Sequence, residues 1–142
     1  MTLVELIIVI AILGLLAGAA LPVARFEVKR QKEKQLKYDL QMMRDALDAY
    51  NTAANMGAFK TKADTFNYPP DLQTLVDGVD VGDKKLKFLK EIPTDPMTGT
   101  TDWGMRSMQD DNDSTTWGGQ NVFDVYSKST GTGLNGTKYS DW

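Results

Sequence analysis

The sequence of 142 residues contains neither histidine nor cysteine. Without histidine, the chain lacks the usual general base of neutral-pH catalysis, the Ser-His and Cys-His nucleophile pairs, and the commonest zinc ligand. Without cysteine, it has no thiolate chemistry, no thiolate metal site and no disulfide. These two absences exclude most familiar catalytic sites, and we expect a protein that is not an enzyme and has no catalytic residues.

A strong net charge is absent as well. The formal net charge is -3 and the pI is about 4.9, so the chain has no overall electrostatic attraction for nucleic acid. A chain of 142 residues, of which 42% are hydrophobic, is long enough for about one domain and a short additional segment. We therefore expect one small core and no nucleic-acid partner.

The hydrophobic start of the chain is its most distinctive feature. Residues 6–24 form a run of 19 positions without a charged side chain, and a helix of that length spans about 28 Å, close to the hydrocarbon core of a bilayer. No basic residue precedes the run, as one would in a secretory signal peptide, so we expect the segment to be retained. We predict a transmembrane or polymerisation helix over residues 1–24.

Glu5 is the single charged side chain among the apolar residues of this start. An unpaired carboxylate at membrane depth costs several kcal/mol, so Glu5 needs a partner. The nearest positive group is the α-amino group of Met1, from the same chain or from a neighbouring copy, because the first basic side chain is Arg25. A pair between copies would set their axial register; the alternative is that Glu5 only reaches the lipid headgroups.

Two glycines and a proline interrupt the apolar run. Gly14 and Gly18 form a small-xxx-small pair, which lets helix backbones approach closely in an apolar setting. Pro22 removes one backbone donor and obstructs the preceding turn. The sequence therefore predicts a kink or local break between Gly14 and Pro22.

Residues 25–55 are predicted to continue as an amphipathic helix into the head. Apolar residues recur there at spacings of four and three, as in a helix packed on an apolar surface: Leu36, Leu40, Met43, Leu47 and Tyr50. A continuous helix from Thr2 to Asn55 would be about 80 Å long, so its first half must protrude from a small head.

A basic collar opens this second segment, and only Glu27 and Glu33 oppose its positive charges. Its members are Arg25, Lys29, Arg30, Lys32, Lys34 and Lys37. Beside a membrane span such a collar favours the cytoplasmic side. It could instead line a filament and pair with acidic neighbours, or be no more than a solvated helix face.

Residues 56–142 are predicted to form a globular head of short elements. Asp71 is a candidate cap for a short helix. The segments 103–108 and 122–127 alternate like strands of one antiparallel sheet, with a polar loop over 109–120 between them. Residues 84–90 are interpreted as a loop or another short helix. The expected fold class is α+β.

Aromatic and acidic residues in the head have both a functional and a structural interpretation. Trp103, Trp117 and Trp142 could form a binding platform, but packing in the core or at subunit interfaces is the favoured interpretation. Asp95, between Pro93 and Pro96, is interpreted as a turn former and not as a ligand.

The start Met1 to Ile10, together with Pro22, resembles the mature N-terminus of type IV pilins and of type II secretion pseudopilins. Tyr68-Pro69, the stretch Ile92 to Pro96 and the segment Val122 to Ser127 are similar to the major pseudopilin. The resemblance implies a pilin-like fold, in which a long N-terminal helix packs on a small antiparallel sheet. It also implies that Met1, where phenylalanine is usual, is the residue exposed by prepilin peptidase and N-methylated, and that Glu5 makes the register contact.

The function implied by this resemblance is a structural subunit that homopolymerises into a pseudopilus and supports type II protein secretion across the outer membrane. Its implied partners are minor pseudopilins, an inner-membrane assembly platform and prepilin peptidase. The expected location is a bacterial inner membrane before assembly, with the head in the periplasm. The residues expected to pack in the filament core are Leu6, Ile10, Gly14, Gly18 and Pro22.

Two other functions remain open. One is a type IV pilus subunit for adhesion, motility or DNA uptake, although the missing cysteine pair argues mildly against a typical pilin head. The other is a membrane-anchored hydrolase, whose only candidates are Ser-Lys pairs such as Ser127 and Lys128. Adjacent residues of a strand point to opposite faces, so that pair is poorly placed for catalysis.

The resemblance also implies a calcium site built from aspartates in the C-terminal loop. The corresponding residues 128–142 contain Asp141 as their only acidic side chain, whereas calcium requires several converging oxygen ligands. A second acidic cluster, Asp110, Asp111 and Asp113, lacks the continuation of an EF-hand loop and is interpreted as a solvated turn. We expect no cofactor and no metal site.

Overall fold

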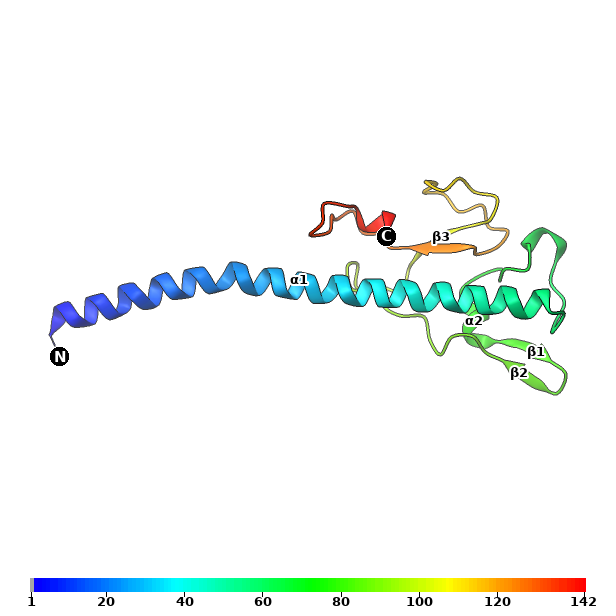
Figure 1. Cartoon of the computed structure of the whole chain (residues 1–142), viewed down its shortest axis with the longest axis horizontal. Coiled ribbons are helices and arrows are strands. Elements are labelled where there is room, and N and C mark those ends of the chain that lie inside the picture. Colours follow the sequence, from blue (N-terminus) through cyan, green and yellow to red (C-terminus); the bar gives the residue numbers. More distant parts are fainter. Residues whose placement is uncertain (1) are drawn as a thin grey trace.

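One long helix dominates the structure, a computed structural model that describes residues 2–142. This helix, α1 (Leu3–Asn55), has 53 residues and a length of about 80 Å at 1.5 Å per residue. It ends where the sequence predicts, at Asn55. The head surrounds only its C-terminal half, and the N-terminal half protrudes as expected (Figure 1).

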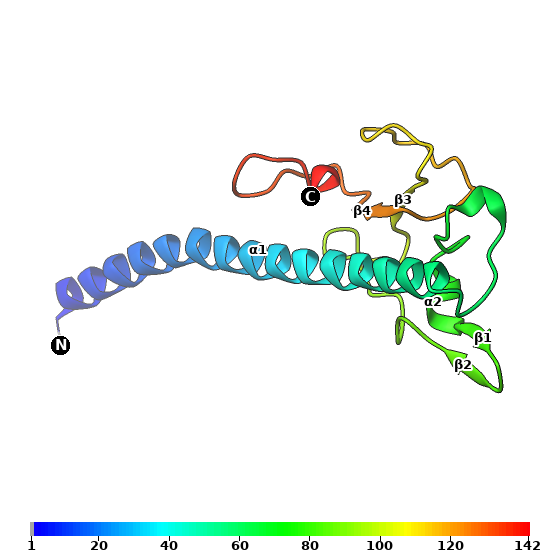
Figure 2. The ribbon, with the colours of Figure 1, turned by 45° about the vertical axis from the view of Figure 1, so that its right-hand side comes forward.

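Of the kink or local break predicted between Gly14 and Pro22, the break is wrong, because α1 remains α-helical through that segment. A proline in a helix interior removes one hydrogen bond and its ring crowds the carbonyl one turn earlier, here that of Gly18. In a helix of this length the strain can be relieved by bending, and α1 is arched in both ribbon views (Figures 1 and 2). Proline and glycine therefore bend this helix without ending it.

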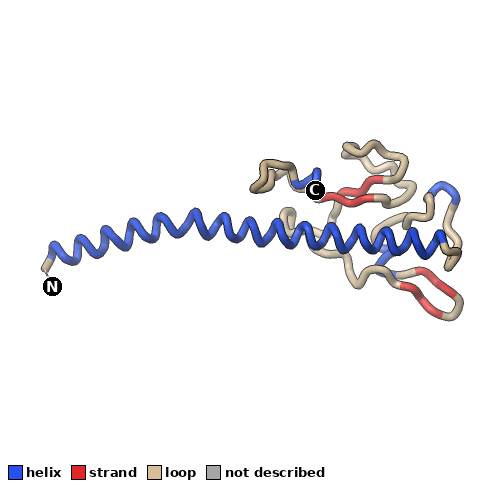
Figure 3. The backbone as a smooth tube through the Cα atoms, in the orientation of Figure 1, coloured by secondary structure: helices blue, strands red, loops and turns tan. Residues whose placement is uncertain are grey.

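The head consists of short elements joined by long loops (Figure 3). In chain order these are η1 (Ala63–Thr65), α2 (Gln73–Asp77), β1 (Val79–Val81), β2 (Lys84–Leu86), β3 (Gly104–Arg106), β4 (Asp124–Tyr126) and η2 (Tyr139–Asp141). β1 pairs with β2 and β3 pairs with β4, both antiparallel. The long helix with small antiparallel sheets is the predicted α+β, pilin-like layout.

The two sheets differ in how well the sequence predicted them. β3 and β4 lie inside the predicted strands, with Met105 opposite Val125. The interpretation of residues 84–90 as a loop or short helix is wrong at its start, because β2 forms a hairpin with β1. Gly82, with φ of +60°, allows the tight turn between them. The sequence did not predict this strand because two of the three β2 residues are lysines, and lysine is depleted in strands.

The apolar stripe of α1 packs into the core as predicted. Leu36, Leu40, Met43, Leu47 and Tyr50 are all buried, together with head residues that include Leu75, Trp103, Val122 and Val125. The Trp103 indole N–H donates to the Pro93 carbonyl at 2.8 Å. Packing in the core is thus confirmed for Trp103.

Asp71, the predicted cap residue, bonds to the first turn of the short helix, but it lies one position before the N-cap residue, Leu72, whose side chain makes no cap bond. The Asp71 carboxylate accepts the backbone N–H of Thr74 at 2.8 Å, just inside α2. It also accepts the Thr74 hydroxyl at 2.8 Å. Such a side-chain acceptor satisfies a backbone donor that the first turn leaves free.

Candidate functional site

The N-terminal half of α1 is an apolar surface without a partner among residues 2–142, which the structure describes. Every described residue up to Val28 is exposed, and Leu6 and Ile10 are 46% and 61% exposed. A Cβ atom added at Gly14 or Gly18 would have no neighbour within 4 Å. Covering such a surface is favourable by about 25 cal/mol per Å² of apolar area, so a contiguous patch of this size indicates an interaction site.

The residues predicted for a filament core lie along this surface in steps of four: Leu6, Ile10, Gly14, Gly18 and Pro22. Residues four apart are neighbours on a helix surface, so these positions form a continuous and slowly rotating strip. By length and composition α1 could also cross a membrane. Contact of the strip with other copies stays a prediction.

Glu5 has hydrogen-bond partners within the chain that the sequence reasoning missed. Its carboxylate accepts the Thr2 backbone N–H at 2.8 Å, and the Thr2 hydroxyl accepts the Glu5 backbone N–H at 3.2 Å. This reciprocal arrangement is a capping box at the start of α1. The signal was readable in the sequence, because Thr2 and Glu5 have the S/T-x-x-E spacing. The predicted partner, Met1, lies outside the described residues.

The capping box uses part of the bonding capacity of Glu5. An ionised carboxylate has about four lone-pair sites, and the bonds from Thr2 reach Oε2 alone, at 2.8 Å from its backbone N and 3.3 Å from its hydroxyl. The carboxylate is exposed, so a cation from another molecule has access to it. A register contact is therefore compatible with the cap.

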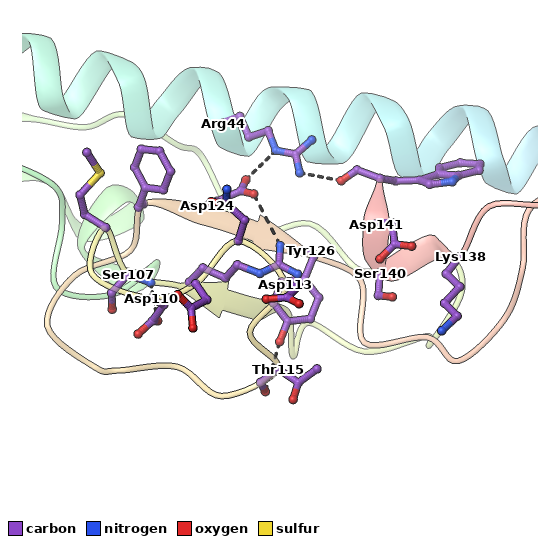
Figure 4. A pocket seen from close by; sticks show the side chains of 16 residues that line it. Arg44, Ser107, Asp110, Asp113, Thr115, Asp124, Tyr126, Lys138, Ser140 and Asp141 are labelled. Carbon is purple, nitrogen blue, oxygen red and sulfur yellow. Dashed lines mark hydrogen bonds and ion pairs between the residues drawn. The ribbon is translucent and has the colours of Figure 1, made fainter.

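A hollow of about 740 Å³ in the head lies between the loop after β3, strand β4 and the C-terminal residues. Arg44 reaches across from α1 to Asp124 at 2.8 Å, and Arg106 lies 3.8 Å from the same carboxylate (Figure 4). The Arg106 guanidinium also lies 4.1 Å over the Tyr126 ring. Both arginines thus fasten the helix and the loop to β4.

Ser127 and Lys128, the residues of the hydrolase alternative, do not form a pair. The buried Ser127 hydroxyl donates to Asp95 at 2.5 Å, whereas the Lys128 ammonium lies 2.9 Å from Asp102 at the surface. Asp95 also accepts the Met97 backbone N–H at 2.8 Å, as a turn former does. This arrangement brings no amine to the serine hydroxyl, as its activation would require.

The acidic cluster after β3 is organised by backbone donors. Asp110 accepts the N–H groups of Ser107 at 2.8 Å and of Gly118 at 3.0 Å. These backbone hydrogen bonds hold the pKa of the Asp110 carboxyl below its usual range. Asp111 and Asp113 are exposed. Among the described residues, no three acidic side chains are grouped closely enough to hold a metal ion.

Glu33 is the polar residue whose importance the sequence reasoning missed. The sequence indicates only a charge that opposes the basic collar, yet Glu33 is buried on α1 and bonded to the C-terminal residues. Its spacing from Leu36 and Leu40 contains the signal, because residues three and seven positions apart share a helix face. A charged residue on a buried stripe requires a partner.

No protein-family model matches the chain, and neither a curated protein nor a solved structure matches it.

Proposed function

We propose that this chain is a structural subunit that homopolymerises through the exposed half of α1 into a pseudopilus-type filament. The carrying observation is that every described residue up to Val28 is exposed, although most of these side chains are apolar. A helix with its apolar surface uncovered needs a bilayer, other helices, or both in succession.

The two environments correspond to two stages of the proposed assembly. Before assembly the apolar half lies in the bacterial inner membrane, with the head in the periplasm. During assembly it leaves the lipid and packs against the same half of other copies, while the heads form the outer surface. The resemblance to the major pseudopilin makes type II secretion the preferred process, with prepilin peptidase, minor pseudopilins and the assembly platform as partners.

Glu5 is the residue on which register depends in this proposal. Its carboxylate would pair with the α-amino group of Met1 on a neighbouring copy, which desolvates both charges together and disfavours other axial positions. The intrachain capping box complicates the simplest test, because Glu5→Ala removes the cap as well as the charge. A pair of variants separates these two roles.

The test uses Glu5→Gln and Thr2→Ala in cells that express the subunit, with filaments sheared off and counted by electron microscopy. Glutamine can keep the capping box but has no charge, whereas Thr2→Ala keeps the charge and loses the cap hydroxyl. We expect no filaments with Glu5→Gln and near-normal filaments with Thr2→Ala. Both variants should still insert into the membrane.

The reverse pattern, filaments with Glu5→Gln and none with Thr2→Ala, would falsify the register role and leave Glu5 as a helix cap. Tracing the wild-type filament tests the larger proposal, since the exposed halves of α1 should be found packed together in its centre. A chain found only as a membrane-anchored monomer would overturn homopolymerisation itself.

A further inference from the structure

The last eleven residues of the chain lie along α1 beside the base of the head (Figures 1 and 2). This tail, residues 132–142, contains a bridge between Thr132 and Lys138 and the helical turn η2. It reaches toward the protruding half of α1, beyond β3 and β4 (Figure 1). It contacts both α1 and β4.

Glu33 makes the central contact with the tail. Its Oε1 atom accepts the Leu134 backbone N–H at 2.8 Å and the Tyr139 hydroxyl at 2.9 Å. Both Glu33 and Tyr139 are buried. Burial, followed by the hydrogen bond and charge of Glu33, raises the pKa of Tyr139 to about 12. Tyr139 therefore stays a neutral donor across the physiological range.

Three basic residues of α1 extend this contact on either side of Glu33. The Lys29 ammonium donates to the Thr132 carbonyl at 2.9 Å, and the Lys37 ammonium lies 4.7 Å from the centre of the Trp142 ring. Arg44 donates to the Trp142 carbonyl at 2.7 Å. Lys29, Glu33, Lys37 and Arg44 are spaced by four, four and seven residues, so they share one face of the helix. We call these four residues the polar clasp.

The calcium site implied by the resemblance would lie in this same region, but several of the oxygen atoms there are already engaged. The Thr132 and Trp142 carbonyls accept from Lys29 and Arg44. The Asn135 side-chain oxygen accepts both the N–H and the hydroxyl of Thr137. In the described chain, no buried side-chain oxygen lacks a hydrogen-bond partner.

The charges of the region also disfavour a divalent cation. Asp141 is the only acidic side chain of residues 128–142, and calcium binding sites normally supply several carboxylates. The Lys29 ammonium already lies against a tail carbonyl, so a calcium ion there would meet a positive charge. The donor set present does not fit calcium.

We infer that the polar clasp fastens the C-terminal tail to α1 without any metal ion. Hydrogen bonds from α1 hold the tail where a calcium ion would otherwise bind several of its oxygen atoms together. The head is thereby extended along the helix as far as Lys29, close to the C-terminal end of the apolar half. Packing of the tail against α1 should therefore not depend on calcium.

The test is hydrogen exchange of the tail, measured on the full-length chain in detergent for peptides covering residues 128–142. Glu33→Ala leaves the Leu134 and Tyr139 donors without their acceptor, and we expect exchange of the tail to rise about tenfold. Glu33→Gln keeps an oxygen at the same place and should stay close to wild type. Glu27→Ala, an exposed glutamate on the same helix, is the matched control and should have no effect.

The same measurement is made with calcium and with a chelator, and neither should change the exchange of the wild-type tail. Slower exchange in calcium would overturn the inference, as would equal rates for Glu33→Ala and Glu27→Ala. If Glu33→Ala does not accumulate, Tyr139→Phe removes a single hydroxyl from the contact. We then expect a rise of about two- to fivefold, and an unchanged rate would equally overturn the clasp.

Discussion

The two halves of α1 belong to one continuous helix but have opposite surroundings. In the C-terminal half, Leu36, Leu40, Met43 and Leu47 are covered by the head. In the N-terminal half, the leucines, isoleucines and valines are exposed, and no described residue of the head covers them. Hydrophobic stabilisation comes from surface removed from water, so the C-terminal half stabilises this fold and the N-terminal half can stabilise only an assembly or a membrane-bound state.

The polarity of the two halves shows the same division. The C-terminal half has apolar residues on one face and charged residues elsewhere, as expected for a helix on the surface of a small protein. The N-terminal half is apolar all round from Leu6 to Ala24, which is typical of helices surrounded by lipid or by other helices. The boundary lies where the first buried residue, Glu33, meets the C-terminal tail.

The sharpest way to test this division is to make the same truncation in both halves. Leu47 is 1% exposed and Leu15 is 75% exposed. Leu47→Ala should lower the free energy of unfolding of the head by about 2–5 kcal/mol, because it leaves a cavity. Leu15→Ala should change it by less than about 0.5 kcal/mol. Denaturant titration in detergent, followed by tryptophan fluorescence, measures both, and equal losses would contradict the division.

A charge in the protruding half should have the complementary effect. Ile10→Arg places a charged side chain inside the apolar run, where it opposes membrane insertion by up to about 2.5–3.5 kcal/mol, the cost at the centre of a membrane helix. We expect the membrane-bound fraction to fall and filaments to disappear, while the melting temperature of the head stays unchanged. Ile10→Leu is the control and should behave as wild type. Normal filaments with Ile10→Arg would show that this surface is not buried on assembly.

The smallest effect is expected at the boundary between the halves, where a rise in pH should weaken the packing of the tail against α1. Because the pKa of Tyr139 rises to about 12 in the folded chain, its neutral form favours the closed tail below the ordinary tyrosine pKa near 10. That contribution is lost as the pH rises from about 10 to about 12. Hydrogen exchange of residues 128–142 should accelerate in this interval, after correction for the intrinsic rate, and Tyr139→Phe should remove the acceleration. An acceleration that persists in Tyr139→Phe would point to other groups.

Local patterns predicted the elements that depend on neighbours close in sequence. The helix end at Asn55, the buried stripe, the Asp71 cap and strands β3 and β4 all follow from periodicity and short-range polar contacts. The predicted break near Pro22 does not occur, because one proline costs less than the hydrogen bonds of the long helix on either side stabilise. Strand β2 was missed because its lysines suit solvent and its pairing with β1 decides its conformation.

Two features can be predicted without the fold: a long helix protrudes from a small head, and Glu5 is the single charged residue of its apolar start. Both follow from the order of charged and apolar residues along the chain. The role of Glu33 depends instead on the fold, because its partners, Leu134 and Tyr139, lie more than 100 positions away. Spacing along a helix can show that a buried carboxylate needs donors, but the path of the folded chain determines which donors reach it.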